Sequence, residues 1–339
     1  MTQPSDRGSN EPLAPFHEVR IGRDHPEDIR SSFEENGYLL FKGALNPETV
    51  LRARSDIAGV LKRQGVMEED SAEPRATPGA SAVEVDMGPH YRLISPWELM
   101  ASPELQEAVD IAFGEKVRVG RSIGFRYSMP TDAPYLTPPH QDHFYIRETD
   151  EFRMIWVPLM DMEIANGGLA IASGSHKHGL QEHVEFDGVY SYFFKGRTQK
   201  GVRLEDTHGV WTSSPFEVGD LLMFHCCAVH RSLPNVSGLV RLSLNTITYP
   251  ARRPTMWQAE RTGPELEVFR AEVERICIAQ GIVGDRFEEI QIMAFKQGDD
   301  PSPELIAKLA AQLERRVPAA DQERRVPAAG LPTPEGAAG

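Results

Sequence analysis

Residues 219–232 read Gly-Asp-Leu-Leu-Met-Phe-His-Cys-Cys-Ala-Val-His-Arg-Ser. A Gly-Asp turn followed by the four apolar residues 221–224 predicts a short strand that is buried on both faces. Histidines follow this strand at two positions, and His225 and His230 are both candidates for a functional role at its end. The apolar run is much shorter than the roughly 20 residues that a membrane-spanning helix requires.

The strand pattern continues on both sides of this stretch. From about residue 116 to residue 250, short runs rich in Val, Ile, Phe and Tyr alternate with turn signals. The candidate strands are 117–128, 139–147, 152–161, 168–172, 220–226 and 239–249. Because few of them are separated by helical patterns, we predict a mostly antiparallel jelly roll or barrel. One connection, from about residue 179 to residue 215, is too long for a hairpin.

Helical patterns flank this β region, so the predicted fold class is mainly β with flanking helices. The other expected elements are a helix over about 26–35, a strand over 38–41, a helix from Pro47 to Gly65, and helices opening at Pro264 and Pro303. Residues 66–90 form a long irregular segment between predicted elements. Such a segment is uncommon in a folded region unless it has a task, for instance covering a site.

The two ends of the chain differ from the middle. Residues 1–18 are polar and rich in Pro and Ser, and the heptapeptide Glu-Arg-Arg-Val-Pro-Ala-Ala occurs twice within the tail 314–339. Both compositions predict disorder. Residues 19–313 are expected to form a single domain around a β core at about 116–250.

Charge and cysteine content narrow the class of protein. The 339 residues include 36 Lys and Arg against 50 Asp and Glu, a net charge of −14. This acidic balance disfavours nucleic-acid partners and anionic membrane surfaces. Three cysteines, of which Cys226 and Cys227 are adjacent, cannot build a disulfide framework. Since residues 1–16 also lack the apolar region of a secretory signal, we expect a cytoplasmic protein.

The strongest local motif is Pro138-Pro139-His140-Gln141-Asp142. Residues two apart on a strand point to the same face, so an imidazole and a carboxylate are expected to project together. Two histidines and one carboxylate form the facial triad of non-haem Fe(II) oxygenases, which leaves coordination positions open. Taken alone, the His140–Asp142 pair favours a surface ion pair on a half-exposed strand.

A second polar pair interrupts the apolar run 240–244. Arg241 and Ser243 are two residues apart and face the same way on a strand. An inward-facing Arg is costly unless it meets an anion, and a guanidinium beside a hydroxyl suits a carboxylate. An outward-facing pair on an edge strand is the alternative.

Six separated elements, in this order and spacing, resemble the phytanoyl-CoA dioxygenase-like (PhyH) family over roughly residues 30–250. They are His140-Gln141-Asp142, Trp156-Val157-Pro158-Leu159-Met160-Asp161, Asn166-Gly167-Gly168-Leu169, Ser173-Gly174-Ser175-His176, His230 and Arg241. The resemblance implies a double-stranded β-helix core and an Fe(II)- and 2-oxoglutarate-dependent dioxygenase. Because a group of six coincident elements is specific, it weighs more than any one of them.

The resemblance also implies roles for individual residues. In the family the distal histidine precedes the 2-oxoglutarate-binding arginine by about 10–14 residues; Arg241 follows His230 by 11 residues and His225 by 16. His140, Asp142 and His230 are therefore the expected Fe(II) ligands and catalytic residues, and His225, His143 and His176 are not. The expected 2-oxoglutarate contacts are Arg241 and Ser243, with Trp156, Arg126 and Thr137 as further candidates beside the co-substrate.

The implied reaction is hydroxylation of a small molecule by O2, with 2-oxoglutarate converted to succinate and CO2. Three alternatives compete with this interpretation: a cupin-like metal protein with non-oxidative chemistry, a halogenase, and a non-catalytic binding protein of the same fold. The Arg241–Ser243 pair speaks against the first and the Asp142 carboxylate against the second. Within the connection 179–215, the cations Lys195, Arg197, Lys200 and Arg203 suggest either a solvated face or a lid over an anionic substrate.

Overall fold

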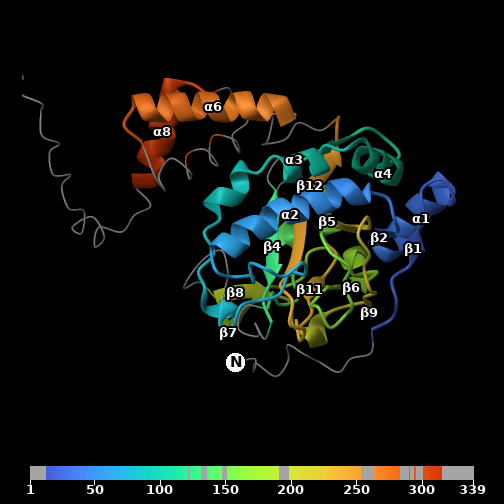
Figure 1. Cartoon of the computed structure of the whole chain (residues 1–339). Helices are drawn as coiled ribbons and strands as arrows, with labels where there is room; N and C mark the ends of the chain where they lie inside the picture. The colour runs from blue at the N-terminus through green and yellow to red at the C-terminus, as the bar shows by residue number, and fades with distance from the viewer. Residues whose placement is uncertain are drawn as a thin grey trace, which may run out of the picture.

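The described part of the protein is a two-sheet β sandwich with helices on one side (Figure 1). The structure is a computed structural model, and it describes residues 13–120, 123–130, 136–146, 151–190, 198–252, 263–282, 290, 294 and 301–314. Among these residues no helix is both long enough and apolar enough to cross a membrane.

The described strands form two facing sheets and a separate hairpin. The larger sheet has the order β1 (Glu18–Val19), β2 (Tyr38–Phe41), β10 (Leu221–His225), β5 (Arg153–Pro158), β12 (Arg241–Pro250) and β3 (Val117–Val119), and β4 (Gly124–Ser128) also pairs with β12. The smaller sheet is β11 (His230–Ser232), β6 (Leu169–Ser173) and β9 (Val210–Thr212), and the hairpin is β7 (Val184–Tyr190) with β8 (Thr198–Gly201). All pairings except β1 with β2 are antiparallel. The predicted jelly-roll core is confirmed.

Alternation along the strands divides the apolar side chains between two cores. In β10, Leu221 and Met223 pack toward the helices, whereas Leu222 and Phe224 pack toward the smaller sheet. The same alternation in β12 sends Leu242 and Leu244 to the helix side. Arg241 and Ser243, at the intervening positions, therefore face the space between the sheets.

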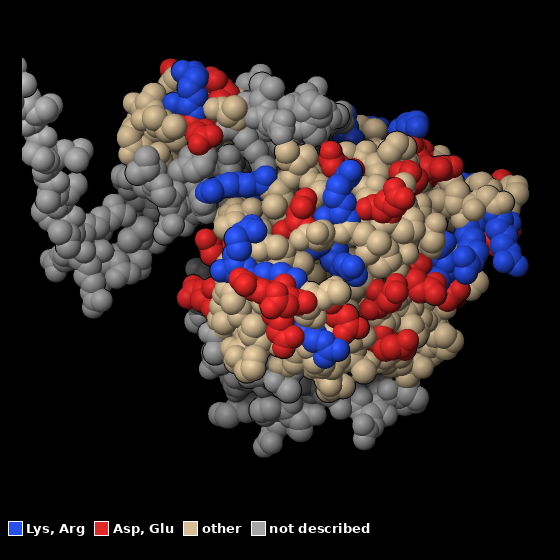
Figure 2. All heavy atoms as spheres, in the orientation of Figure 1, with Lys and Arg blue, Asp and Glu red and all other residues tan. Residues whose placement is uncertain are grey.

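Helices cover the outer face of the larger sheet, where α2 and α3 lie across it in Figure 1. These helices are α1 (Pro26–Asn36), α2 (Pro47–Arg63), α3 (Ser95–Met100) and α4 (Pro103–Phe113). The predicted α2 start is confirmed, since the Asn46 side chain accepts a hydrogen bond from the Glu48 amide at 2.9 Å. The outer side of α2 is charged, and Figure 2 shows Lys and Arg interspersed with Asp and Glu on this face.

A buried ion pair anchors the turn that precedes β10. The Asp220 carboxylate accepts hydrogen bonds from Lys42 at 2.7 Å and from the backbone amides of Gly43 at 3.0 Å and Glu217 at 2.8 Å. Gly219 has φ +102°, and a Cβ there would lie 3.0 Å from the Leu45 carbonyl oxygen. The predicted Gly-Asp turn is therefore held against the residues that follow β2, and β10, which begins after this turn, pairs with β2.

Helices α6 (Gly263–Ala279) and α8 (Pro303–Glu314), both predicted, pack against each other around an apolar cluster that includes Val273, Ile276 and Ile306. Shorter helical turns occur at η2 (Ala80–Ala82), η3 (Gly88–Arg92), η5 (Ser175–His178) and η6 (Leu204–Asp206). Segment 66–90 is folded rather than a loose flap, because Val66, Met67 and Ala80 are part of the helix-side core.

Two predictions need correction. Residues 139–147 are not a strand: His140 makes an isolated bridge, and α5 (Asp142–Ile146) is a short helix. The predicted disorder of residues 1–18 does not extend to residues 13–18, because Ala14 bridges to Thr212 and Phe16 is buried between Tyr38 and Phe216. Residues 1–12 and 315–339 lie outside the described residues.

Candidate active site

A pocket opens between the two sheets at the end where His140 and His230 meet. Side chains of β4, β5, β10 and β12 from the larger sheet, of β6 and β11 from the smaller sheet, and of residues 136–142 line it. Its space, counted out to solvent, is about 880 Å³. The pocket is open to solvent, and both polar and apolar side chains line it, as they do in sites for small molecules.

His140 and His230 are held opposite each other by the backbone. Each amide donates to the other's carbonyl, at 2.9 Å and 3.0 Å, and the two rings lie 4.1 Å apart. The Nδ1 of His140 lies 2.8 Å from the Pro138 carbonyl oxygen, and that of His230 lies 3.1 Å from the Ala228 carbonyl oxygen. A carbonyl can only accept, so each Nδ1 carries the proton and each Nε2 presents a lone pair.

Asp142 completes the group, although from the start of α5 and not from a strand. Its carboxylate oxygens lie 3.8 Å from the His140 Nε2 and 3.4 Å from the His230 Nε2. The three ligand atoms all lie within 4.8 Å of one another. Two imidazole nitrogens and one carboxylate oxygen, all facing an open pocket, are the donor set that suits Fe(II).

The electrostatics of His140 favour metal binding over an ion pair. Burial, followed by the proximity of His230, holds the pKa of His140 well below its usual range. A neutral imidazole is the form that coordinates a cation, whereas a surface ion pair with Asp142 would need the protonated form. Of the two interpretations of the His140–Asp142 pair, the geometry therefore favours the ligand pair.

Arg241 is a buried cation that lines the same pocket. It is 4% exposed, and its Nη1 donates a hydrogen bond to the Ser243 hydroxyl at 2.7 Å. Its Nε has no hydrogen-bond partner, and no carboxylate of the described residues lies within ion-pair distance. Burial, and secondarily the positive charge of Arg126, lower the pKa of Arg241 to about 10. Such a group is costly unless an anion binds to it, and the distal carboxylate of 2-oxoglutarate fits this need.

The three further candidates also line the pocket. Trp156 is buried, and its ring lies 5.9 Å from the Arg241 guanidinium carbon. Arg126 lies directly across from Ser243 in the β4–β12 pairing, and its Nε donates to the Asn245 side chain at 3.1 Å. Thr137 lies on the segment that leads to His140, where its carbonyl accepts from the Ser232 amide.

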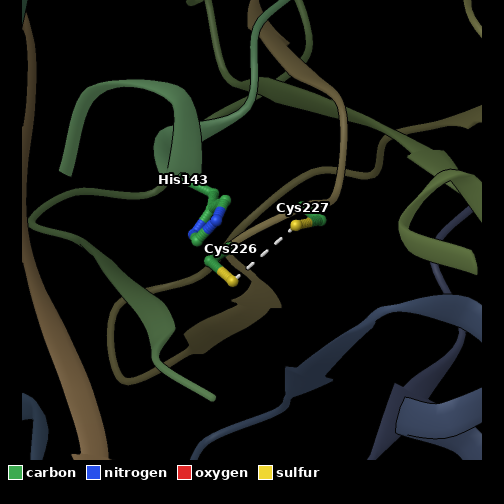
Figure 3. A group of neighbouring side chains, drawn as sticks. All are labelled: His143, Cys226 and Cys227. Atoms are coloured by element: carbon green, nitrogen blue, oxygen red, sulfur yellow. Dashed lines mark hydrogen bonds between the residues drawn. The ribbon is translucent and has the colours of Figure 1, made fainter. Parts of the chain in front are cut away.

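The histidines expected to have no ligand role lie outside this group. His225 falls on the helix side of β10, where its Nδ1 accepts from the Cys227 amide at 3.0 Å and its ring lies 6.2 Å from Phe33. His176 lies 5.3 Å from His225, ring to ring. His143 faces Cys226 and Cys227 instead of the pocket (Figure 3).

Gln141 is a residue whose function the sequence left unassigned. Its side chain is fully buried, and Nε2 donates to the carbonyls of Cys227 at 2.7 Å and Gly179 at 2.8 Å. Its Oε1 accepts from the Gln181 amide at 2.7 Å. Gln141 thus ties the segment that carries His140 and Asp142 to the turn that leads to His230. Its place between His140 and Asp142 in the motif was the sequence signal that could have identified it.

The expected lid is described only in part. Lys195 and Arg197 lie outside the described residues. Lys200 lies 4.0 Å from the Glu185 carboxylate, and Arg203 lies 3.2 Å from that of Asp206. The two described cations therefore have acidic neighbours, which weakens the expectation of an anion-binding run.

Comparisons with known proteins identify the family of this chain. The phytanoyl-CoA dioxygenase (PhyH) family matches residues 33–243. A 1-deoxypentalenic acid 11-beta-hydroxylase of Streptomyces arenae is 34% identical over 258 residues, which are 71% of this chain and 87% of the hydroxylase. A protein of the same name from Streptomyces exfoliatus is 31% identical over 255 residues, with the same coverage of both chains.

Among solved structures, the α-ketoglutarate-dependent epimerase SnoN from nogalamycin biosynthesis superposes with a TM-score of 0.45 at 17% identity, over 67% of this chain and 83% of SnoN. The family match runs from β2 to the first residues of β12 and includes every proposed ligand up to Ser243. This chain therefore belongs to the phytanoyl-CoA dioxygenase (PhyH) family of Fe(II)- and 2-oxoglutarate-dependent dioxygenases.

Proposed function

We propose that His140, Asp142 and His230 hold Fe(II), and that Arg241 with Ser243 holds the distal carboxylate of 2-oxoglutarate, so that the chain hydroxylates a small molecule. The single observation that carries this assignment is the buried Arg241 guanidinium, which has no carboxylate partner among the described residues and lines the same pocket as the His140–Asp142–His230 group. A metal protein with non-oxidative chemistry does not need a buried clamp for a dicarboxylate. Bound Fe(II) supplies the activation of O2 that side chains cannot provide.

The chain's own residues would bind and orient the metal and the co-substrate, and they keep water away from them. The carbonyls of Pro138 and Ala228 fix the two imidazoles so that their Nε2 atoms face Asp142. Trp156 and Phe224, both buried, form apolar walls beside them. Such walls strengthen the attraction of Arg241 for a carboxylate, because a charge pair screened from water interacts more strongly.

We further propose that the substrate is an apolar small molecule with one carboxylate. Among the described residues that line the pocket, Arg126 and Arg241 carry positive charge and Asp142 carries the negative charge. A cation on the wall of the pocket attracts a carboxylate. The hydroxylase relative at 34% identity is named for an acid, 1-deoxypentalenic acid, and its name supports this class. A cytoplasmic location, expected from the sequence, stays a prediction.

The direct test is aerobic incubation with Fe(II), 2-oxoglutarate, ascorbate and a panel of carbocyclic acids, each paired with its methyl ester. We expect succinate to form in step with a product that gains one oxygen, from acids and not from their esters. If the esters are hydroxylated equally well, the carboxylate requirement is wrong. Absence of any 2-oxoglutarate turnover, with or without candidate substrates, would contradict the assignment of Arg241.

A further inference from the structure

A second group of side chains that could hold a metal ion lies on the segments next to the proposed iron ligands. It consists of His143 on α5 and of Cys226 and Cys227 on the turn after β10 (Figure 3). Their ligand atoms all lie within 4.8 Å of one another. His143 lies more than 80 residues before the two adjacent cysteines, so the fold and not the local sequence brings it to them.

The sulfur geometry suits a single cation between the two cysteines. The Sγ atoms are 4.0 Å apart. Two thiolates bound at about 2.3 Å to a tetrahedral zinc ion are separated by about 3.8 Å. A covalent S–S bond would need a separation of about 2.05 Å, so this spacing fits a bridging ion and not a disulfide.

One ring nitrogen of His143 has no hydrogen-bond partner among the described residues. The His143 Nδ1 is buried and has no hydrogen bond. By contrast, the nearby His225 Nδ1 already accepts from the Cys227 amide at 3.0 Å, so we do not count it as a ligand. The Cys226 thiol donates to the Cys227 sulfur, so the two sulfur atoms already face each other. A thiolate is the form of cysteine that binds metal.

From this geometry we propose that His143, Cys226 and Cys227 form a site for a thiophilic cation of the zinc type, distinct from the His140–Asp142–His230 group. Two sulfur donors and one imidazole select a soft or borderline ion, whereas the two-histidine, one-carboxylate group suits Fe(II). A cation there would connect α5 to the turn after β10. Because Asp142 opens α5 and His230 follows that turn, its binding would also fix the relative positions of two proposed iron ligands.

Co(II) is a suitable probe, because sulfur-to-cobalt charge transfer absorbs in the near ultraviolet and the proposed iron site has no sulfur ligand. We expect the unmutated chain, titrated with Co(II) under reducing and anaerobic conditions, to develop this band and to saturate at one thiolate-bound ion per chain. The His230→Ala variant should develop the same band, which would separate the new site from the iron site. Zn(II) should displace Co(II) and abolish the band.

Cysteine variants locate the site. Cys227→Ser keeps the volume of the side chain and should reduce the band to about half, because one of two sulfur–metal bonds is lost. His143→Ala should weaken Co(II) binding at least about tenfold. Cys277→Ala is the matched control, since Cys277 is a buried cysteine on α6 outside this group, and it should leave the band unchanged.

Three results would overturn the proposal. One is the absence of a near-ultraviolet band in the unmutated chain at saturating Co(II). Another is a full band in Cys226→Ser/Cys227→Ser. The third is unchanged Co(II) affinity in His143→Ala. Since none of these readouts uses turnover, they are independent of whether the chain hydroxylates the proposed substrate class.

Discussion

Replacing Arg241 by Ala should affect 2-oxoglutarate binding and the stability of the free chain in different directions. In the free chain the guanidinium is buried without a carboxylate of the described residues, so its removal should not lower the free energy of unfolding as a large core truncation would. With 2-oxoglutarate bound, the same change leaves a carboxylate without its partner.

The magnitude follows from the burial of the site. Breaking a buried ion pair costs about 3–5 kcal/mol, and we take the lower end because this pocket opens to solvent. About 3 kcal/mol corresponds to roughly a 100-fold weaker affinity for 2-oxoglutarate. Ser243→Ala is the matched control: it removes the hydroxyl that accepts from Arg241, and the loss of one hydrogen bond of about 1 kcal/mol predicts roughly a fivefold effect.

The assay is thermal unfolding under anaerobic conditions with Fe(II), with and without 2-oxoglutarate. At 100 times its dissociation constant, the co-substrate should stabilise the unmutated chain by about 2.7 kcal/mol, and Arg241→Ala at the same concentration should lose most of this gain. Fe(II) binding itself should change little. If Arg241→Ala keeps the full 2-oxoglutarate stabilisation while Arg126→Ala loses it, then Arg126 and not Arg241 binds the distal carboxylate.

Three further outcomes are expected. Gln141→Ala should weaken Fe(II) binding about 10- to 100-fold in a metal titration, because its side chain ties the ligand-bearing segment to the Cys227 carbonyl; unchanged affinity would limit Gln141 to a packing role. Asp220→Ala should lower the free energy of unfolding, measured in urea, by about 3 kcal/mol, because it removes the buried partner of Lys42 and leaves the exposed Glu217 carboxylate as the acidic partner of the Lys42 amine; a loss below 1 kcal/mol would contradict this. Burial lowers the pKa of His90 to about 4, so the unfolded chain gains a proton below about pH 6.5 that the folded chain does not. The free energy of unfolding should therefore fall by up to about 3 kcal/mol between pH 6.5 and pH 4, and His90→Phe, beside Phe125, should reduce that fall.

The elements with a strong local signal were predictable from the sequence. The apolar run of β10, the Asn46 cap of α2 and the Arg241–Ser243 alternation in β12 each depend on neighbours within a few residues. Side chains also alternate along β10, so Phe224 faces the space between the sheets and His225 faces the helices. The choice of His230 over His225 rested on family spacing, and strand geometry now gives it a physical reason.

Elements that depend on distant contacts were missed. The three-residue strands β9 and β11 are too short for a period to show, and they exist because they pair with β6. Helix α4 did carry a signal, with Ser102 before it and Gly114, at φ 72°, after it. The segment after His140 turns into α5 where the alternation of residues favoured a strand. The His143–Cys226–Cys227 group joins two segments that no local pattern relates.

The central claim, that His140, Asp142 and His230 hold Fe(II), is tested most directly by the absorption of the anaerobic Fe(II) and 2-oxoglutarate complex. Chelation of the keto acid by the bound metal gives a weak visible charge-transfer band. We expect the unmutated chain and His225→Ala to show this band, because His225 faces the helices, and His230→Ala to lose it. A band that persists in His230→Ala and disappears in His225→Ala would contradict the assignment.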